Sequence, residues 1–371
     1  MTDKLIKVAD PVIGDEEINA VVETMRSGII AQGPRVQALE EAFAAYCGTK
    51  YAVAVNSGTA AIHAALYAAG VGPGDEVITV PFSFIATINP ILMVGAKPVL
   101  VDIEPTHFCM DMSKVEAAIT DKTKAIIPVH LYGQPCNADD LKSLAKKHNL
   151  IIIEDACQAV GADYKGAKTG SLGDMGCFSL YATKNIMCGE GGMVTTDNEV
   201  FATTMKQFRQ HGMSAQYEYV DVGYNYRMMD LQAAIAIEQL KKVDTLNTAR
   251  QKNAALLSAG LADIKGLVLP TVAPEGTHVW HQYTIRLTDE FPMTRDELHE
   301  SLKAKDIITG AYYPKPLHSF AHIQKQGYKI GDFPVAEKAA SQVLSLPVHA
   351  KLSAEDVQRI VDEVKQVANG K

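Results

Sequence analysis

Three segments of the chain place reactive side chains at the ends of predicted strands. The first, Asn56-Ser57-Gly58-Thr59, follows an apolar run at 51–55 and precedes a predicted helix. Gly58 permits close approach of a ligand to the backbone, Thr59 offers a hydroxyl group, and the helix start offers free N–H groups. This combination indicates a phosphate-binding site, although an ordinary helix cap would use the same residue types.

The second segment is the end of the apolar run at 150–155, where Asp155 is followed by Gln158. A carboxylate at this position could hold a cationic ring nitrogen or a metal ion. It could equally cap the next turn of the chain, and the isolated residue does not decide between these interpretations. Gln158 could donate a hydrogen bond to a ligand oxygen.

The third segment places Ser179 and Lys184 near the end of a β-rich run at 177–181 and before a glycine-rich stretch at 189–192. A lysine that is partly shielded from water has a lowered pKa and can act as a nucleophile. Most loop lysines are solvated instead, so this segment alone would not establish a reactive amine.

The motifs of several other chemistries are absent from the sequence. No H-E-x-x-H or cysteine–histidine pattern has zinc spacing, so no metal site is predicted. No G-x-S-x-G, G-x-x-x-x-G-K-[ST] or strand-associated G-x-G-x-x-G motif occurs. The six cysteines include no C-x-x-C pair, which indicates reduced thiols.

Short β-rich runs alternate with helical patterns along the first part of the chain. The predicted strands are 51–55, 75–80, 97–103, 125–130, 150–155 and 177–181, with one more at 193–197 that could be antiparallel. The predicted helices lie at 15–27, from 34 to 47, at 59–69, near 86, at 114–120 and at 139–148. This alternation indicates a mainly parallel sheet covered on both faces. Ligands bind beyond the carboxyl ends of such strands, where the three segments lie.

Helix 15–27 has apolar residues at helical spacing. These residues are Ile18, Val21, Val22 and Met25, and Gly28 can end the helix.

The pattern changes after about residue 230, where a helix is predicted at 231–240 with an extension toward 252. A strand at 279–287 and helices near 295–304, 335–343 and 354–367 follow. We therefore expect a large domain at 1–248 and a smaller α+β domain at 249–371. His278 and His281 are expected to face opposite sides of the strand.

Composition and charge limit the class of protein. The chain has 371 residues, of which 47% are hydrophobic and 21% charged, values that are typical of a globular protein. Its 35 basic and 43 acidic residues give a net charge of −8, which argues against broad nucleic-acid binding. No apolar run is long enough to predict a membrane span, and the first residues do not resemble a signal peptide. A cytoplasmic location is expected.

The three segments together have the order phosphate site, carboxylate, lysine, which resembles pyridoxal-phosphate (PLP) enzymes built like aspartate aminotransferase. More specifically, the chain resembles the DegT/DnrJ/StrS family of sugar aminotransferases. The matching motifs include EEAFAAYCGTKYAVAVNSGTAAIHAAL (40–66), IPVHLYGQPCNADDL (127–141), IEDACQAVGADYKG (153–166), FSLYATKNIMCGEGGMVTTD (178–197), GYNYRMMDLQAAI (223–235) and YYPKPLH (312–318). The resemblance implies an α/β fold, the PLP-dependent transferase fold type I. Its large domain has a mainly parallel sheet flanked by helices, and its C-terminal α+β domain is smaller.

The resemblance also implies residue roles. Lys184 matches the lysine that binds the cofactor as a Schiff base, and Asp155 matches the acid that pairs with the pyridinium nitrogen. The other cofactor-binding matches are Gly58, Thr59 and Ser179 at the phosphate, Phe84 on the ring, Gln158 near the phenolic oxygen, and Asn225, which the family supplies from the partner subunit. Arg227, Tyr313 and His318 match substrate-side positions. Cys157 and Cys188 match variable small positions and are interpreted as packing thiols.

The implied activity is transfer of an amino group, by way of pyridoxamine phosphate, from glutamate to a nucleotide-linked keto-sugar. A homodimer with shared active sites is implied as well. The alternatives are another fold type I PLP enzyme, such as a lyase or desulfurase, and a non-catalytic regulatory homologue. A related sugar dehydratase is a further alternative, but that branch typically has histidine at the position of Lys184.

Overall fold

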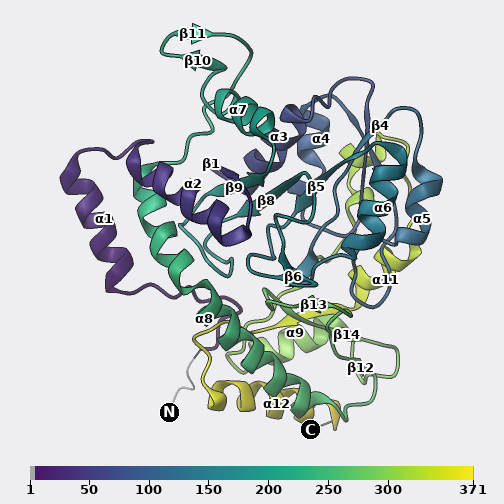
Figure 1. Cartoon of the computed structure of the whole chain (residues 1–371). Helices are drawn as coiled ribbons and strands as arrows, with labels where there is room; N and C mark the ends of the chain where they lie inside the picture. Colours follow the sequence, from purple (N-terminus) through teal and green to yellow (C-terminus); the bar gives the residue numbers. More distant parts are fainter. Residues whose placement is uncertain (1–4, 371) are drawn as a thin grey trace.

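The computed structural model describes residues 5–370 and is built around a seven-stranded sheet in the order β1-β9-β8-β5-β4-β2-β3 (Figure 1). These strands are β1 (Tyr51–Val55), β2 (Glu76–Thr79), β3 (Lys97–Leu100), β4 (Thr123–Ile126), β5 (Ile151–Asp155), β8 (Met175–Ser179) and β9 (Gly192–Thr196). Strand β9 is antiparallel to β1 and β8, and the other pairs are parallel. The sheet is therefore mainly parallel, as predicted, and the strand expected at 193–197 is the antiparallel one.

Helices cover both faces of this sheet because successive strand residues are apolar on both sides. On one face lie α3 (Gly58–Ala68), α4 (Asn89–Met93) and α7 (Glu199–Phe208). On the other face lie α2 (Pro34–Cys47), α5 (Met112–Ala118), α6 (Ala138–His148), α8 (Asp230–Leu261) and α11 (Pro334–Gln342). The alternation seen in the sequence thus produces a three-layer arrangement.

Helix α8 continues from the large sheet into a smaller C-terminal layer (Figure 1). There its last turns pack with a three-stranded sheet and two helices. These elements are β12 (Leu267–Val268), β14 (Tyr283–Leu287), β15 (Val343–Leu346), α9 (Arg295–Lys303) and α12 (Ala354–Ala368). The predicted boundary at 248/249 falls inside the continuous helix α8, and the division into domains stays a prediction.

Short elements complete the described chain. The small strands are β6 (Asp163–Tyr164), β7 (Ala167–Lys168), β10 (Met213–Ala215), β11 (Glu218–Tyr219) and β13 (Gly276–Thr277). The small helices are η1 (Ile85–Thr87), η2 (Leu131–Gly133), η3 (Leu317–Ser319) and α10 (Ala321–Gln324). Strands β10 and β11 form a hairpin that projects from the large domain beside α7 (Figure 1). Within residues 5–370, no helix combines the length and the apolar character needed to cross a bilayer.

The first helix, α1 (Asp15–Ser27), has the predicted bounds, but the apolar residues at helical spacing do not form its buried face. Ile18 and Met25 are 53% and 62% exposed, whereas Glu17 is buried. The reason is polar: the carboxylate of Glu17 accepts hydrogen bonds from Gln239 Nε2 at 2.7 Å and Lys242 Nζ at 2.8 Å on α8. These bonds turn the apolar side of α1 outward.

The strand predicted at 279–287 is shorter than expected because β14 begins only at Tyr283. His278 and His281 precede it in irregular backbone, and both are buried. The expectation that they face opposite sides of a strand is therefore wrong, since period-two alternation applies only to extended strands.

Asp230, at the start of α8, fixes the start of α2. Its fully buried carboxylate accepts hydrogen bonds from the backbone N–H groups of Gly33, Arg35 and Val36 at 2.8, 3.0 and 3.0 Å. It thereby takes the place of an N-terminal capping side chain, which Gly33 cannot provide.

Replacing this carboxylate, Asp230→Ala, is expected to lower the free energy of unfolding by about 3 kcal/mol, because one buried and two half-buried N–H donors lose their acceptor. Chemical denaturation measures the change. Asp121→Ala is the control, because Asp121 is exposed and makes no hydrogen bond or ion pair with residues 5–370. A loss below about 0.5 kcal/mol, the usual range for surface changes, would contradict the capping role.

Candidate active site

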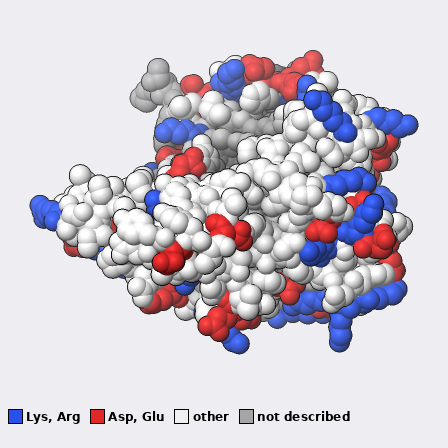
Figure 2. Space-filling model, turned by 90° about the horizontal axis from the view of Figure 1, so that it is seen from above, with Lys and Arg blue, Asp and Glu red and all other residues white. Residues whose placement is uncertain are grey.

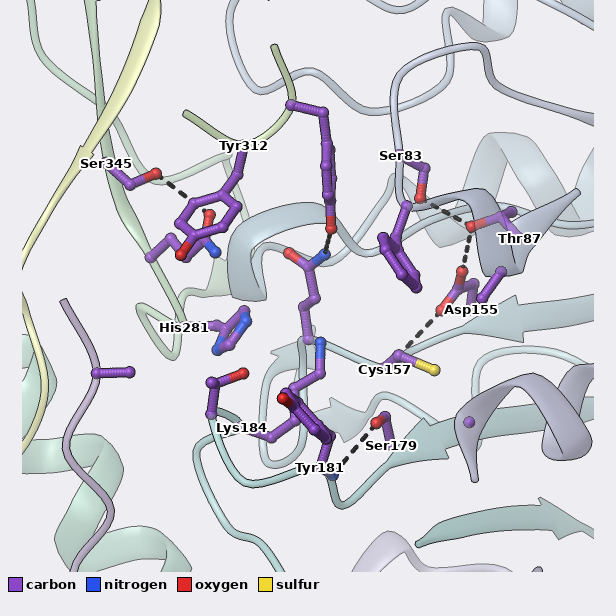
Figure 3. Close-up of a pocket in the computed structure, with 18 of the residues that line it drawn as sticks. Ser83, Thr87, Asp155, Cys157, Ser179, Tyr181, Lys184, His281, Tyr312 and Ser345 are labelled. Atoms are coloured by element: carbon purple, nitrogen blue, oxygen red, sulfur yellow. Dashed lines mark hydrogen bonds between the residues drawn. The ribbon is translucent and has the colours of Figure 1, made fainter. Parts of the chain in front are cut away.

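The carboxyl ends of β5 and β8 and the start of α3 meet at one cavity of about 590 Å³ (Figure 3). Neighbouring parallel strands bring Asp155 and Ser179 together, since Asp155 pairs with Cys177 in the β5–β8 register. Of the residues singled out in the sequence, those that line this cavity are Gly58, Thr59, Phe84, Asp155, Gln158, Ser179, Lys184 and Tyr313. The three reactive segments therefore form one site.

The start of α3 forms a cradle suited to phosphate. Ser57 caps the helix by accepting a hydrogen bond from Ala60 N–H at 3.1 Å. A Cβ atom on Gly58 would lie 2.9 Å from Ser179 Cβ and 3.0 Å from Cys157 Sγ, so a side chain there would need its neighbours to move. Glycine thus brings the helix start, with its free N–H groups and positive dipole end, against the strand ends.

The carboxylate of Asp155 is held at the end of β5 by a short chain of hydroxyl groups. Thr87 Oγ1 donates to Asp155 Oδ2 at 2.7 Å, and Ser83 Oγ lies 2.8 Å from Thr87 Oγ1 (Figure 3). The backbone N–H of Cys157 donates to Oδ1 at 3.3 Å. These bonds orient an acceptor group that can pair with a cationic ring nitrogen.

Gln158 is fixed at both ends of its amide. Its Oε1 accepts from Tyr132 N–H at 2.8 Å, and its Nε2 donates to the Tyr313 hydroxyl at 3.0 Å. Because an amide nitrogen carries two hydrogens, one donor is left for a ligand oxygen. Burial raises the pKa of Tyr313, which keeps its hydroxyl protonated. Phe84 is 55% exposed beside this tyrosine, with a ring-centroid distance of 6.1 Å.

Lys184 opens onto the cavity from the loop after β8, opposite the carboxylate of Asp155 (Figure 3). Desolvation by the surrounding protein lowers the pKa of its amine, while the nearby Asp155 carboxylate acts in the opposite direction. A lowered pKa increases the fraction of neutral, nucleophilic amine at neutral pH. Burial also raises the pKa of the Cys157 thiol, so this neighbour is not an ionised competitor.

His281 faces the same cavity near Lys184 (Figure 3). Its Nδ1 lies 3.3 Å from Asn185 Oδ1, and the Asn185 amide is oriented by donating to Asn247 Oδ1 and Val279 O, both at 2.8 Å. Burial, reinforced by the charges of Lys184 and Arg250, holds the His281 pKa far below its usual value. The imidazole is therefore neutral with its proton on Nδ1, and Nε2 is an acceptor.

Three predicted residues lie outside the cavity. Asn225 is exposed, and its backbone carbonyl accepts from Asn56 Nδ2 at 3.4 Å. Arg227 is half-buried and makes no hydrogen bond or ion pair with residues 5–370. His318 is fully buried and bonds to Glu337 Oε1 at 2.9 Å. Their roles in binding stay predictions.

Several residues that line the site had no role predicted from the sequence. Thr87 belongs to the segment 83–87 (SFIAT), which contains the predicted cofactor-binding residue Phe84. A hydroxyl group so close to Phe84 could have indicated a residue of the site. Arg250, His281, Tyr312 and Ser345 also line the cavity, but they come from segments far along the chain. No local pattern in the sequence connects them to Asp155 or Lys184.

The residues of the cavity fit PLP. The α3 start and Ser179 offer donors for its phosphate, and the Asp155 carboxylate suits a protonated ring nitrogen. Lys184 offers an amine for the aldehyde carbon, and Phe84 offers an aromatic face. The close packing at Gly58 is an observation independent of these side chains, because it brings the free N–H groups of the α3 start against the strand ends, beside the cavity.

Comparisons with known proteins agree with this geometry. The sequence profile of the DegT/DnrJ/EryC1/StrS aminotransferase family matches residues 11–365. GDP-perosamine synthase from Caulobacter vibrioides is 42% identical, covering 98% of each chain. The structure of DesV from S. venezuelae has a TM-score of 0.92 at 39% identity, covering 95% of this chain and 94% of that one. Spr1654 from Streptococcus pneumoniae, in its PMP form, has a TM-score of 0.94 at 31% identity, covering 99% and 98%.

The lowered pKa of Lys184 can be tested in protein stripped of its cofactor. Labelling with a small acylating reagent, read by peptide mass spectrometry, is expected to reach half its maximum below pH 10.5, the ordinary lysine value. Asp155→Asn removes a charge that favours the ammonium form, so it is expected to shift the midpoint to still lower pH. A midpoint at or above the ordinary value would refute a desolvated amine.

Proposed function

The chain belongs to the DegT/DnrJ/EryC1/StrS aminotransferase family, and we propose that it transfers an amino group from glutamate to a nucleotide-linked keto-sugar. Family membership confirms the predicted fold type I architecture and the predicted class of PLP-dependent sugar aminotransferase. The observation that carries the proposal is the placement of Lys184 and Asp155 in one cavity beside the start of α3.

The cofactor supplies an electron-withdrawing ring that stabilises negative charge on the carbon next to the transferred nitrogen. Asp155 supports this chemistry by pairing with the ring nitrogen, and Thr87 keeps the carboxylate aimed at it. Donors at the start of α3 and on Ser179 bind the phosphate. Gln158 would offer its remaining N–H to the ring oxygen, and Phe84 would offer its aromatic face to the ring.

Lys184 has two roles in this proposal. Its neutral amine would hold the cofactor covalently, and Nζ, once free, would take a proton from the donor carbon as a base and return it as an acid. Burial favours the neutral base for the first transfer. His281 keeps an acceptor nitrogen beside this position and remains uncharged, so it does not compete for the proton.

The proposed acceptor is supported by the name of a relative and by the openness of the site. GDP-perosamine synthase is named for a nucleotide-linked amino sugar. Phe84 and Tyr181 on the cavity wall are 55% and 45% exposed, which leaves the rim accessible to a large ligand. Arg227, with no partner among residues 5–370, is the proposed contact for an anionic diphosphate.

A homodimer with shared sites forms part of the proposal. The outward side of α1 carries Ile18, Val22 and Met25, all exposed, and the following loop exposes Ile29 and Ile30. Few charged side chains lie over this part of the molecule, at the left in the view from above (Figure 2). A continuous apolar surface of this kind favours association, and a second copy is the occupant we propose.

The position of Asn225 also favours a second copy. Asn225 matches a family position that binds the cofactor phosphate, but it lies outside the cavity of its own chain. In a dimer it would reach the cavity of the other subunit. Arg227, two residues away, would enter the same site from the same side. Each site would then be complete only in the dimer.

The proposed function predicts two separable half-reactions. L-glutamate should shift the visible absorbance of the holoenzyme, and one member of a panel of nucleotide keto-sugars should restore it. Lys184→Ala should abolish transfer of the amino group in both directions, because no other lysine among residues 5–370 lines the cavity and could move the proton. Turnover with small keto acids alone, and with no nucleotide sugar of a broad panel, would overturn the proposed acceptor.

Shared sites predict complementation between inactive variants. Lys184→Ala and Asn225→Ala chains are each expected to be impaired, whereas a mixed dimer contains one site with both native residues. Activity should therefore reappear in verified mixed dimers, at up to about half of the wild-type level per dimer. Absence of recovery would count against shared sites, provided that each variant alone is impaired.

A further inference from the structure

Arg250, in the middle of α8, is a buried cation on the wall of the active-site cavity. It is 6% exposed and lines the cavity together with Lys184 and His281. Its Nη1 donates to the backbone carbonyls of Trp280 at 3.1 Å and His281 at 3.2 Å. Its Nε is buried without a hydrogen-bond partner, and no carboxylate of residues 5–370 lies within ion-pair distance.

The other buried arginines of the described chain each have a carboxylate partner. Arg209 pairs with Glu40, and Arg295 Nε lies 2.5 Å from Asp296 Oδ1. The Nε atoms of both arginines also lack a hydrogen-bond partner, so the absence of a carboxylate is what distinguishes Arg250. The carboxylate of Asp10 lines a small adjoining cavity with Arg250, but it pairs with Lys351 Nζ at 3.3 Å. A buried guanidinium without an anion is costly, which indicates that Arg250 has its counterion in a ligand.

Burial lowers the pKa of Arg250 to about 10, so the side chain remains charged at neutral pH. Among the residues that line the cavity, the other lysine or arginine is Lys184, which the reaction itself uses. An amino-acid donor carries a carboxylate on the same carbon as the reacting amine. The fork of a guanidinium matches a carboxylate in geometry and charge.

We propose that Arg250 binds the carboxylate of the amino donor and so places the donor amine beside Lys184. This inference rests on the proposed function, because it takes an amino acid as the donor. The keto-sugar acceptor has no carboxylate at the reacting carbon, so Arg250 acts in one half-reaction only. If Arg250 only supported the backbone of Trp280 and His281, its replacement would impair both half-reactions.

The test compares Arg250→Gln with the wild-type holoenzyme in the two half-reactions. The glutamate concentration that half-saturates the first is expected to rise about 30-fold or more, the usual effect of removing one partner of a buried charge pair. The keto-sugar concentration that half-saturates the second half-reaction is expected to stay unchanged. Arg295→Gln is the matched control, because it removes a buried arginine with two carbonyl contacts outside the cavity.

A binding measurement gives a readout independent of turnover. Glutarate, a dicarboxylate without an amine, is titrated into each holoenzyme by calorimetry. Wild type and Arg295→Gln are expected to bind it, and Arg250→Gln is expected to lose binding. Unchanged glutamate and glutarate constants in folded Arg250→Gln protein would overturn the proposal, and so would equal damage to both half-reactions.

If Arg250→Gln does not fold, the test is a crystal structure of the wild-type holoenzyme with glutarate. A carboxylate hydrogen-bonded to Arg250 supports the proposal, and a carboxylate bound elsewhere overturns it. If wild type fails to react with glutamate, the proposed donor is wrong, whereas glutarate binding and its dependence on Arg250 still decide the carboxylate site.

Discussion

The close packing of the α3 start against the ends of β5 and β8 is the constraint on which this site depends. A Cβ atom at Gly58 would meet Ser179 and Cys157, and one at Gly192 would lie 2.2 Å from Ser57 O. Both positions therefore exclude a side chain without local rearrangement. Because the helix start lies this close to the strand ends, donors for a phosphate, the Asp155 carboxylate and Lys184 can contact one bound molecule.

Two successive carboxylates on β5, Glu154 and Asp155, have different roles because their hydrogen-bond partners differ. Glu154 is fully buried and accepts hydrogen bonds from Gly170, Leu172 and Gly173 N–H at 2.8 Å each, with His130 Nε2 at 2.9 Å. Its acceptor capacity is used within the protein. Asp155 points to the opposite face and has one side-chain donor, Thr87, so it retains capacity for a ligand. The two side chains meet different partners because successive residues of a strand point to opposite faces of the sheet.

Buried carboxylates elsewhere in the molecule are also paired with donors of the protein itself. Glu17 meets Lys242 and Gln239, Glu40 meets Arg209, and Asp230 meets three backbone N–H groups. Each of these carboxylates has its partners within the protein. Arg250 has no carboxylate partner among residues 5–370, and it lies on the cavity wall. The paired groups hold the elements together, whereas Arg250 is the buried cation for which we propose a partner in the ligand.

The order of strands and helices along the chain could be predicted from the sequence, and so could the segments that contain Asp155, Ser179 and Lys184. Those features are local, because each reactive residue lies at or just after the end of an apolar strand. The distant residues that join them could not be predicted, since Arg250 and His281 reach the cavity through α8 and the segment before β14. The tertiary structure also decided which side of α1 faces inward. Bonds from Glu17 to residues more than 200 positions away outweigh the apolar pattern, and periodicity within one helix contains no information about such partners.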